Sequence, residues 1–191
     1  MSLEVNAYAR SNDPVLRSDM DEALAAAGLR YLLFEDLDSF RLVDGIFVRS
    51  CDMVAWDNES GIEDDVKRAV ATRDQAALGK LLSDDRIGSL AIHLELPYMP
   101  DPEVITDLRK QGVNHAIVDR IAEATLFYSV STPETRNDFS MDLQTMVGNL
   151  LGIALDGIIE DPQVGTFYNM ARDDGRPLPT QAKKKPGWRF W

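Results

Sequence analysis

Two histidines, one cysteine and several carboxylates are the residues of this chain that could do chemistry. A cysteine and a histidine can act as nucleophile and base, and histidines can share acid–base work with carboxylates, if the fold brings them together. Candidate catalytic residues are His93 and His115, together with Glu160 and Asp161 beside an expected C-terminal hairpin. Cys51 could pair with either histidine, but no catalytic signature surrounds it.

Ordinary structural roles also account for these residues. His93 falls on the polar side of an alternating strand, His115 stands at a helix start, and Asp161 precedes a proline in a turn. The sequence contains no phosphate-binding loop, dinucleotide fingerprint, nucleophile elbow or pair of residues with metal-ligand spacing. We therefore expect no metal and no cofactor, and an enzyme only if dispersed residues converge in the fold.

The C-terminal tail, residues 173–191, has the most unusual composition. Residues 175–191 hold five basic residues and no acidic one, a charge of +5. Because the whole chain has a net charge of −12, the rest of the chain carries −17. Basic residues next to aromatic anchors are typical of a docking segment. The expected partner-binding residues are Lys183, Lys184, Lys185, Trp188, Phe190 and Trp191. The tail could dock on its own chain, on a second subunit of a homodimer, or on another partner.

The acidic body of the chain restricts the classes of partner. Its charge repels phosphates and disfavours nucleic acid, whereas it suits a basic protein. No apolar run is long enough to span a bilayer, and the N-terminus lacks the regions of a signal peptide. A single cysteine excludes an internal disulfide framework and fits a reducing compartment. These observations predict a cytoplasmic protein with no membrane span.

The stretch from Ala122 to Tyr168 predicts the unit around which the rest of the chain packs. Residues 125–131 are apolar at consecutive positions, as expected for a central strand buried on both faces. Residues 137–155 predict a long helix, and residues 157–168 predict a hairpin around a proline-containing turn. The helix should bury one apolar face, made of Leu143, Met146, Val147, Leu150, Leu151 and Ala154.

Strands and helices also alternate before this unit. Strands are expected at residues 3–9, 31–34, 40–43, 46–48, 53–56 and 89–96. Helices are expected at residues 13–28, 62–70, 76–82, 101–112 and 114–123. Asp13–Pro14 and Asp101–Pro102 have the residue types of a helix start, and Asp44–Gly45 indicates a two-residue hairpin. Thr72–Gln75 resembles a capping box and separates two helices.

This order of elements predicts an α+β fold with a mixed or antiparallel sheet and packed helices. We expect one domain over residues 1–172, followed by the tail. Residues 1–56 and 89–170 both run strand, Asp-Pro helix, strand, which suggests two similar βαβ-type halves joined by helices at 62–82. The spacing of Gly148 and Gly152 indicates close helix packing or a dimer face.

Two hypotheses of different classes follow for function. The first is a non-enzymatic protein-interaction domain, immunity- or inhibitor-like, that binds a basic partner; small acidic proteins that neutralise basic toxins or nucleases share this charge logic. The second is a small hydrolase whose site is assembled from dispersed carboxylates and histidines. We favour the first because the chain is acidic and carries no catalytic or cofactor signature. A homodimer that exchanges its tails is a further interpretation.

Overall fold

The structure of the chain is a computed structural model, and it describes residues 4–13, 15, 17–35, 41–43, 46–58, 61–72, 74–132 and 137–169. The described strands are β1 (Glu4–Ala9), β2 (Leu29–Glu35), β3 (Arg41–Val43), β4 (Ile46–Asp57), β5 (Ile87–Leu96), β6 (Leu126–Ser131), β7 (Ile158–Asp161) and β8 (Thr166–Tyr168). The described helices are α1 (Arg17–Ala26), α2 (Glu63–Thr72), α3 (Gln75–Leu81), α4 (Pro102–Lys110), α5 (His115–Ala122) and α6 (Asp138–Ala154).

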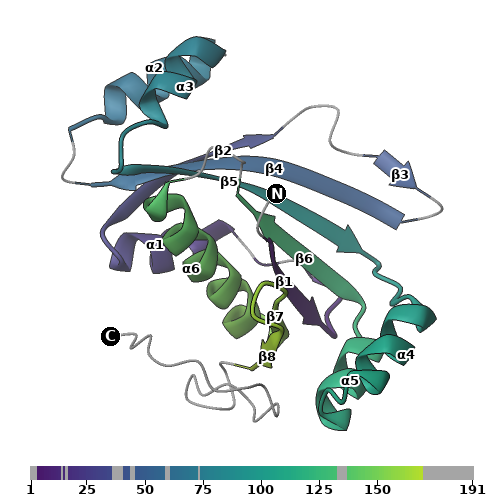
Figure 1. Cartoon of the computed structure of the whole chain (residues 1–191). Coiled ribbons are helices and arrows are strands. Elements are labelled where there is room, and N and C mark those ends of the chain that lie inside the picture. The colour runs from purple at the N-terminus through teal and green to yellow at the C-terminus, as the bar shows by residue number, and fades with distance from the viewer. Residues whose placement is uncertain are drawn as a thin grey trace.

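The described strands form one antiparallel sheet, which confirms the predicted α+β class (Figure 1). The strand order is β2-β4-β5-β6-β1-β7-β8. Strand β3 pairs with the first residues of β4, on the edge of β4 that further along pairs with β2. In β1, Ala7 lies opposite Tyr128 of β6 on one side and Ile159 of β7 on the other. The strand predicted to be central, β6, therefore lies inside the sheet between β5 and β1.

The prediction of two short strands at 46–48 and 53–56 was wrong, because β4 is continuous. Its pairing with β5 runs from Phe47 opposite Leu96 to Trp56 opposite Ile87. The polar residues in the middle of β4 are weak strand formers, but the ladder to β5 supplies their backbone hydrogen bonds. On its other side β4 pairs first with β3 and then with β2. The expected hairpin residues, Asp44–Gly45, lie outside the described residues.

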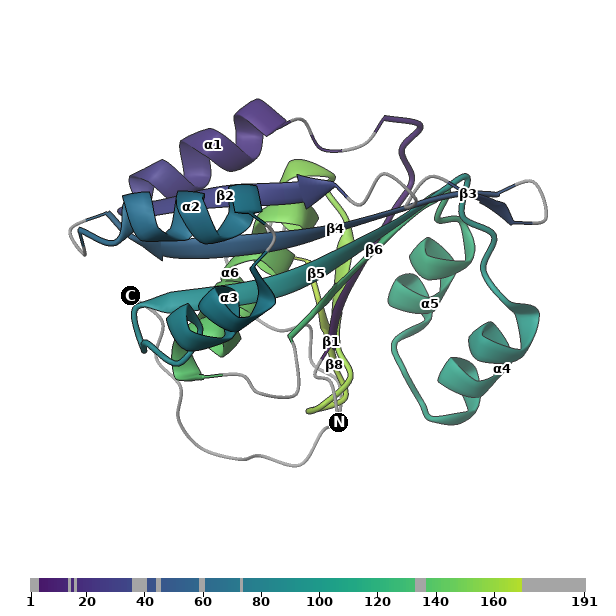
Figure 2. The same cartoon turned by 90° about the horizontal axis from the view of Figure 1, so that it is seen from above.

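The two faces of the sheet are covered differently, as Figure 1 and Figure 2 show. Helices α1 and α6 cover one face, and its core contains Met20, Leu24, Met53, Leu90, Leu126, Leu143, Val147 and Leu151. On the other face α2 and α3 pack over Val54 and Trp56 at one end. Helices α4 and α5 pack over Tyr8, Ile158 and Phe167 at the opposite end.

This unequal cover corrects the expectation that β6 is buried on both faces. Leu126, Tyr128 and Val130 are buried under α1 and α6, whereas the alternate residues of β6 are only partly buried. The second face is covered by helices at its ends, so the central strand is half solvated there. Strand β5 behaves as predicted, with Leu90 and Ile92 in the core and His93 on the opposite face.

The long helix α6 begins at the predicted position and packs closely on the sheet. Asn137 is its N-cap, and its side chain accepts a hydrogen bond from the Ser140 amide at 2.9 Å. A Cβ built on Gly148 would lie 2.5 Å from Val5 Cγ1, and one built on Gly152 would overlap the side chain of Ile159. The glycine spacing therefore serves close helix packing against β1 and β7.

Of the three helix starts predicted from Asp-Pro pairs or a capping box, one is confirmed. Asp101 caps α4, because its Oδ1 accepts from the Glu103 amide at 2.8 Å. The break between α2 and α3 is confirmed, but the cap of α3 is Asp74, which accepts from the amides of residues 76 and 77. Thr72 instead donates to the carbonyl of Arg68, so it extends α2 and makes no capping box. The predicted start at Asp13–Pro14 was wrong, because Val15 is not helical and α1 begins only at Arg17. Pro14 itself lies outside the described residues.

None of the described helices combines the length and the apolar character that crossing a membrane requires. The prediction of one domain over residues 1–172 with a tail at 173–191 stays a prediction, as do the two similar halves.

Candidate functional site

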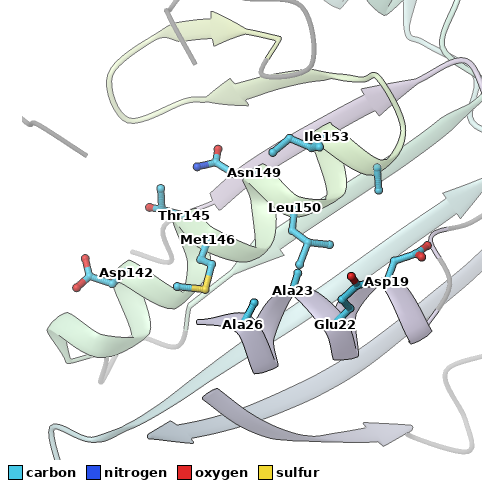
Figure 3. Close-up of a pocket in the computed structure, with 11 residues that line it drawn as sticks. Asp19, Glu22, Ala23, Ala26, Asp142, Thr145, Met146, Asn149, Leu150 and Ile153 are labelled. Atoms are coloured by element: carbon cyan, nitrogen blue, oxygen red, sulfur yellow. The ribbon is translucent and has the colours of Figure 1, made fainter. Parts of the chain in front are cut away.

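A groove with a volume of about 960 Å³ lies between α1 and α6 (Figure 3). The two helices lie side by side on the same face of the sheet. Helix α6 contributes Met146, Leu150 and Ile153 to the floor, and α1 contributes Ala23 and Ala26. A cavity of this size lies within the range of ligand-binding clefts in proteins.

The sequence of α6 explains why the groove is apolar. Leu143, Val147 and Leu151 are spaced by four residues and are buried against the sheet. Met146 and Leu150 form a second row beside the first, and they pack against the core while remaining partly exposed to the groove. The apolar surface of α6 is thus wider than the part of it that the sheet covers. The small alanines of α1 leave the second row uncovered.

Carboxylates line the edges of this apolar floor. In Figure 3, Asp142 lies at one end of the groove, and Asp19 and Glu22 lie towards the other. All three side chains are exposed, and within the described residues none of them forms an ion pair. None of the described lining residues is basic. Ile153, on the floor, is 50% exposed, so apolar surface and negative potential meet at one place.

The predicted candidates His93 and Glu160 lie on the opposite face of the sheet. His93 lies opposite Ser129, Ser129 opposite Asn6, and Asn6 opposite Glu160. His93 and Glu160 are therefore three strands apart, roughly 14 Å at about 4.8 Å per strand. His93 Nε2 lies 3.4 Å from Glu95 Oε1 of its own strand. The structure brings the two residues to one face but does not bring them together.

The other candidates are not brought to a common site either. His115 is the first residue of α5 and is exposed. Asp161 Oδ1 accepts a hydrogen bond from the Gln163 amide at 3.0 Å, which is the expected turn role. Cys51 lies opposite Ile92 and packs into the core under α1 and α6, whereas His93 points to the other face. A Cys51–His93 catalytic pair is therefore excluded by the register.

Glu160 takes part in a small polar network. Its Oε2 accepts hydrogen bonds from the Tyr8 hydroxyl at 2.6 Å and from Asn6 Nδ2 at 3.0 Å. Burial, and next the negative charge of Glu160, raise the pKa of Tyr8 far above its usual value. Tyr8 therefore stays a neutral hydrogen-bond donor at physiological pH, and together with Asn6 it holds the carboxylate in one orientation.

Three tyrosines with raised pKa values predict a loss of stability in alkali. Burial raises the pKa of Tyr98 and of Tyr168 to about 12, and that of Tyr8 further. The unfolded chain releases these protons near the ordinary value of 10, so the contribution of the three tyrosines to the free energy of unfolding should be constant below that pH and fall as pH rises towards 12. Denaturant unfolding at several pH values measures this, with tyrosinate absorbance as a second readout. Tyr168→Phe should flatten the fall, and an identical slope in this variant would contradict the assignment.

The remaining expectations concern residues that the structure does not describe or groups that it does not assemble. The tail residues Lys183, Lys184, Lys185, Trp188, Phe190 and Trp191 lie outside the described part of the chain. Within that part, no three histidine, cysteine or acidic side chains gather where they could hold a metal ion.

Sequence reasoning did not find the groove, although a signal for it was present. The six apolar residues predicted on one side of the helix at residues 137–155 form a stripe that is too wide to be buried by the sheet alone. Part of that stripe must therefore face something other than the sheet. A comparison of the chain with models of known families, with curated proteins and with solved structures found no match.

Proposed function

We propose that this protein is a non-enzymatic interaction domain that binds a basic segment of a partner protein in the groove between α1 and α6. The observation that carries the proposal is the apolar floor between Asp19 and Glu22 on one side and Asp142 on the other. A basic amphipathic helix presents the complement, with apolar anchors in the middle and cations at the edges. The lone cysteine and the acidic composition support a cytoplasmic, immunity- or inhibitor-like role.

The size of the groove limits the length of the bound segment. From Asp142 to Ile153 the floor follows about three turns of α6, roughly 17 Å at 1.5 Å per residue. A helix of about eleven residues spans this length and places anchors at i, i+4 and i+7 over Met146, Leu150 and Ile153. The small side chains of Ala23 and Ala26 leave room for such a helix to approach α1 closely.

The proposal predicts binding of a designed helical peptide of leucine and lysine, measured by fluorescence anisotropy with the full chain. A peptide of the same pattern with glutamate in place of lysine should not bind. The double variant Glu22→Lys/Asp142→Lys should weaken binding at least tenfold, about 1.4 kcal/mol, because it reverses charge at both edges. High salt should weaken binding of the lysine peptide to the unchanged protein.

Two control variants separate the groove from the overall charge and hydrophobicity. Asp64→Lys/Glu103→Lys makes the same change of net charge at exposed positions of α2 and α4, which pack on the opposite face of the sheet, and it should have a much smaller effect. Ile153→Asn removes apolar floor without a change of charge and should weaken binding, whereas Val164→Asn, on the exposed β7–β8 turn, should not. Equal binding of both peptides, or equal effects of both double variants, would overturn the proposal.

The chain's own C-terminal tail, residues 173–191, is basic and aromatic and so has the chemistry of the proposed ligand. The Tyr168 hydroxyl donates to Asn149 Oδ1 at 2.9 Å, and Asn149 lines the groove, so the C-terminal end of the described chain contacts a residue of the groove. If the tail were the occupant, deletion of residues 176–191 would strengthen peptide binding, and it would also lower the solution mass if the tail were exchanged in a homodimer. Under the partner proposal, deletion changes neither the affinity for the peptide nor the number of chains in the particle.

A further inference from the structure

A second cavity, with a volume of about 650 Å³, lies on the face of the sheet opposite the groove. The end of α4 and the turn after it form one wall, with Val104, Leu108 and Val113. The β7–β8 hairpin forms the other wall, with Phe167 and Glu160. Glu160 and Phe167 lie opposite each other in the ladder, so an acid and an aromatic ring stand side by side.

The negative charge of Glu160 has no counter-ion within the described residues. Both of its hydrogen bonds come from neutral donors, Tyr8 and Asn6, and both go to Oε2. Asn6 turns its Nδ2 to the carboxylate even though its own Oδ1 is then buried without a hydrogen-bond partner in the described structure. The other carboxylate of the lining, Asp107, lies 2.9 Å from Lys110 Nζ, and none of the described lining residues is basic.

We propose that this cavity binds a small organic cation, a primary amine or guanidinium on an apolar body, with Glu160 as its counter-ion. Oε1 of Glu160 receives no hydrogen bond from the described residues and is the oxygen left for the ligand. Tyr8 and Asn6 fix the carboxylate before the ligand arrives, which lowers the entropic cost of binding. Val104, Leu108, Val113 and Phe167 would contact the hydrocarbon part of the ligand.

The composition of the cavity selects this class of ligand over others. A metal ion needs several converging oxygen or nitrogen ligands, and no such group of acidic or histidine side chains is found among the described residues. An anion would be repelled by Glu160, and a neutral apolar molecule would leave its charge uncompensated. An alkyl or aryl amine satisfies both the carboxylate and the apolar walls.

Isothermal titration calorimetry of the full chain with hexylamine and with 1-hexanol tests the proposal without any substitution. The two probes have the same hydrocarbon body, and only the amine carries a charge at neutral pH. We expect hexylamine to bind at least tenfold more tightly than hexanol, because a charge-assisted hydrogen bond is worth more than a neutral one. No binding of the amine, or equal binding of the two probes, would overturn the proposal.

Substitutions then locate the site. Glu160→Gln keeps an oxygen that can accept from Tyr8 and Asn6 but removes the charge, and it should weaken hexylamine binding about 10- to 100-fold. Asp161→Asn makes the same chemical change one residue away, at a turn carboxylate that is not among the described lining residues, and should leave binding unchanged. Val104→Trp should obstruct the cavity while Glu160 remains intact. Unchanged hexylamine binding in both Glu160→Gln and Val104→Trp would show that the amine does not bind in this cavity. Either outcome leaves the proposal for the groove between α1 and α6 untouched.

Discussion

Replacement of Asn137 by alanine is expected to lower the free energy of unfolding by about 2–4 kcal/mol, more than the loss of an ordinary helix cap. Asn137 Oδ1 accepts from the amide and the hydroxyl of Ser140, at 2.9 and 2.8 Å. Its Nδ2 donates to the carbonyls of Asp84 and Ile87, at 3.1 and 2.8 Å. The side chain thus caps α6 and also ties that helix to the turn before β5.

A second N-cap asparagine provides the matched control. Asn114 caps α5 through one hydrogen bond from the Ala116 amide, and it is exposed. Asn114→Ala should therefore lose about 1 kcal/mol. Asn137→Ser keeps a capping oxygen but loses the two donated bonds, so its loss should lie between the two alanine variants. Denaturant unfolding measures all three, and equal losses for Asn137→Ala and Asn114→Ala would show that the link to Asp84 and Ile87 contributes nothing.

Gly152→Val is expected to destabilise the protein by about 3 kcal/mol, because the new side chain has no room against β7. A Cβ at this position already overlaps the side chain of Ile159, which is fully buried and cannot move into solvent. Gly79→Val is the control, since Gly79 also lies inside a helix but has no neighbouring atom within 4 Å of a built Cβ. The control shares the change in helix propensity, so the difference between the two variants reports packing alone. Losses of the same size would contradict close contact between α6 and β7.

Elements with a strong local signal could be predicted from the sequence. Helix α6 has its asparagine cap and its apolar repeat, and the helix α4 has its Asp-Pro start, so both occur where they were expected. The α+β class and the position of β6 inside the sheet were also predicted correctly, and of the two predicted kinds of sheet, mixed or antiparallel, the structure has the antiparallel one. For the two helices, neighbouring residues in the sequence contain the information, because caps and periodicity are local properties.

Features that depend on distant pairing could not be predicted in the same way. Strand β4 is continuous because β5 supplies its ladder, although its own middle residues are polar. The distance between His93 and Glu160 depends on a strand order in which β6 and β1 separate β5 from β7. The groove depends on which helix lies beside α6, and residues 17–26 gave no indication that they would be its neighbour.

The most direct test of the account is to locate the bound basic peptide by amide chemical shifts in the full chain. The account predicts that the leucine–lysine peptide perturbs the amides of Glu22–Ala26 in α1 and of Met146–Ile153 in α6, and that Glu22→Lys/Asp142→Lys abolishes these changes. Perturbations centred on β5 and β6 of the opposite face, around His93 and Ser129, would contradict the assignment of the groove as the binding site.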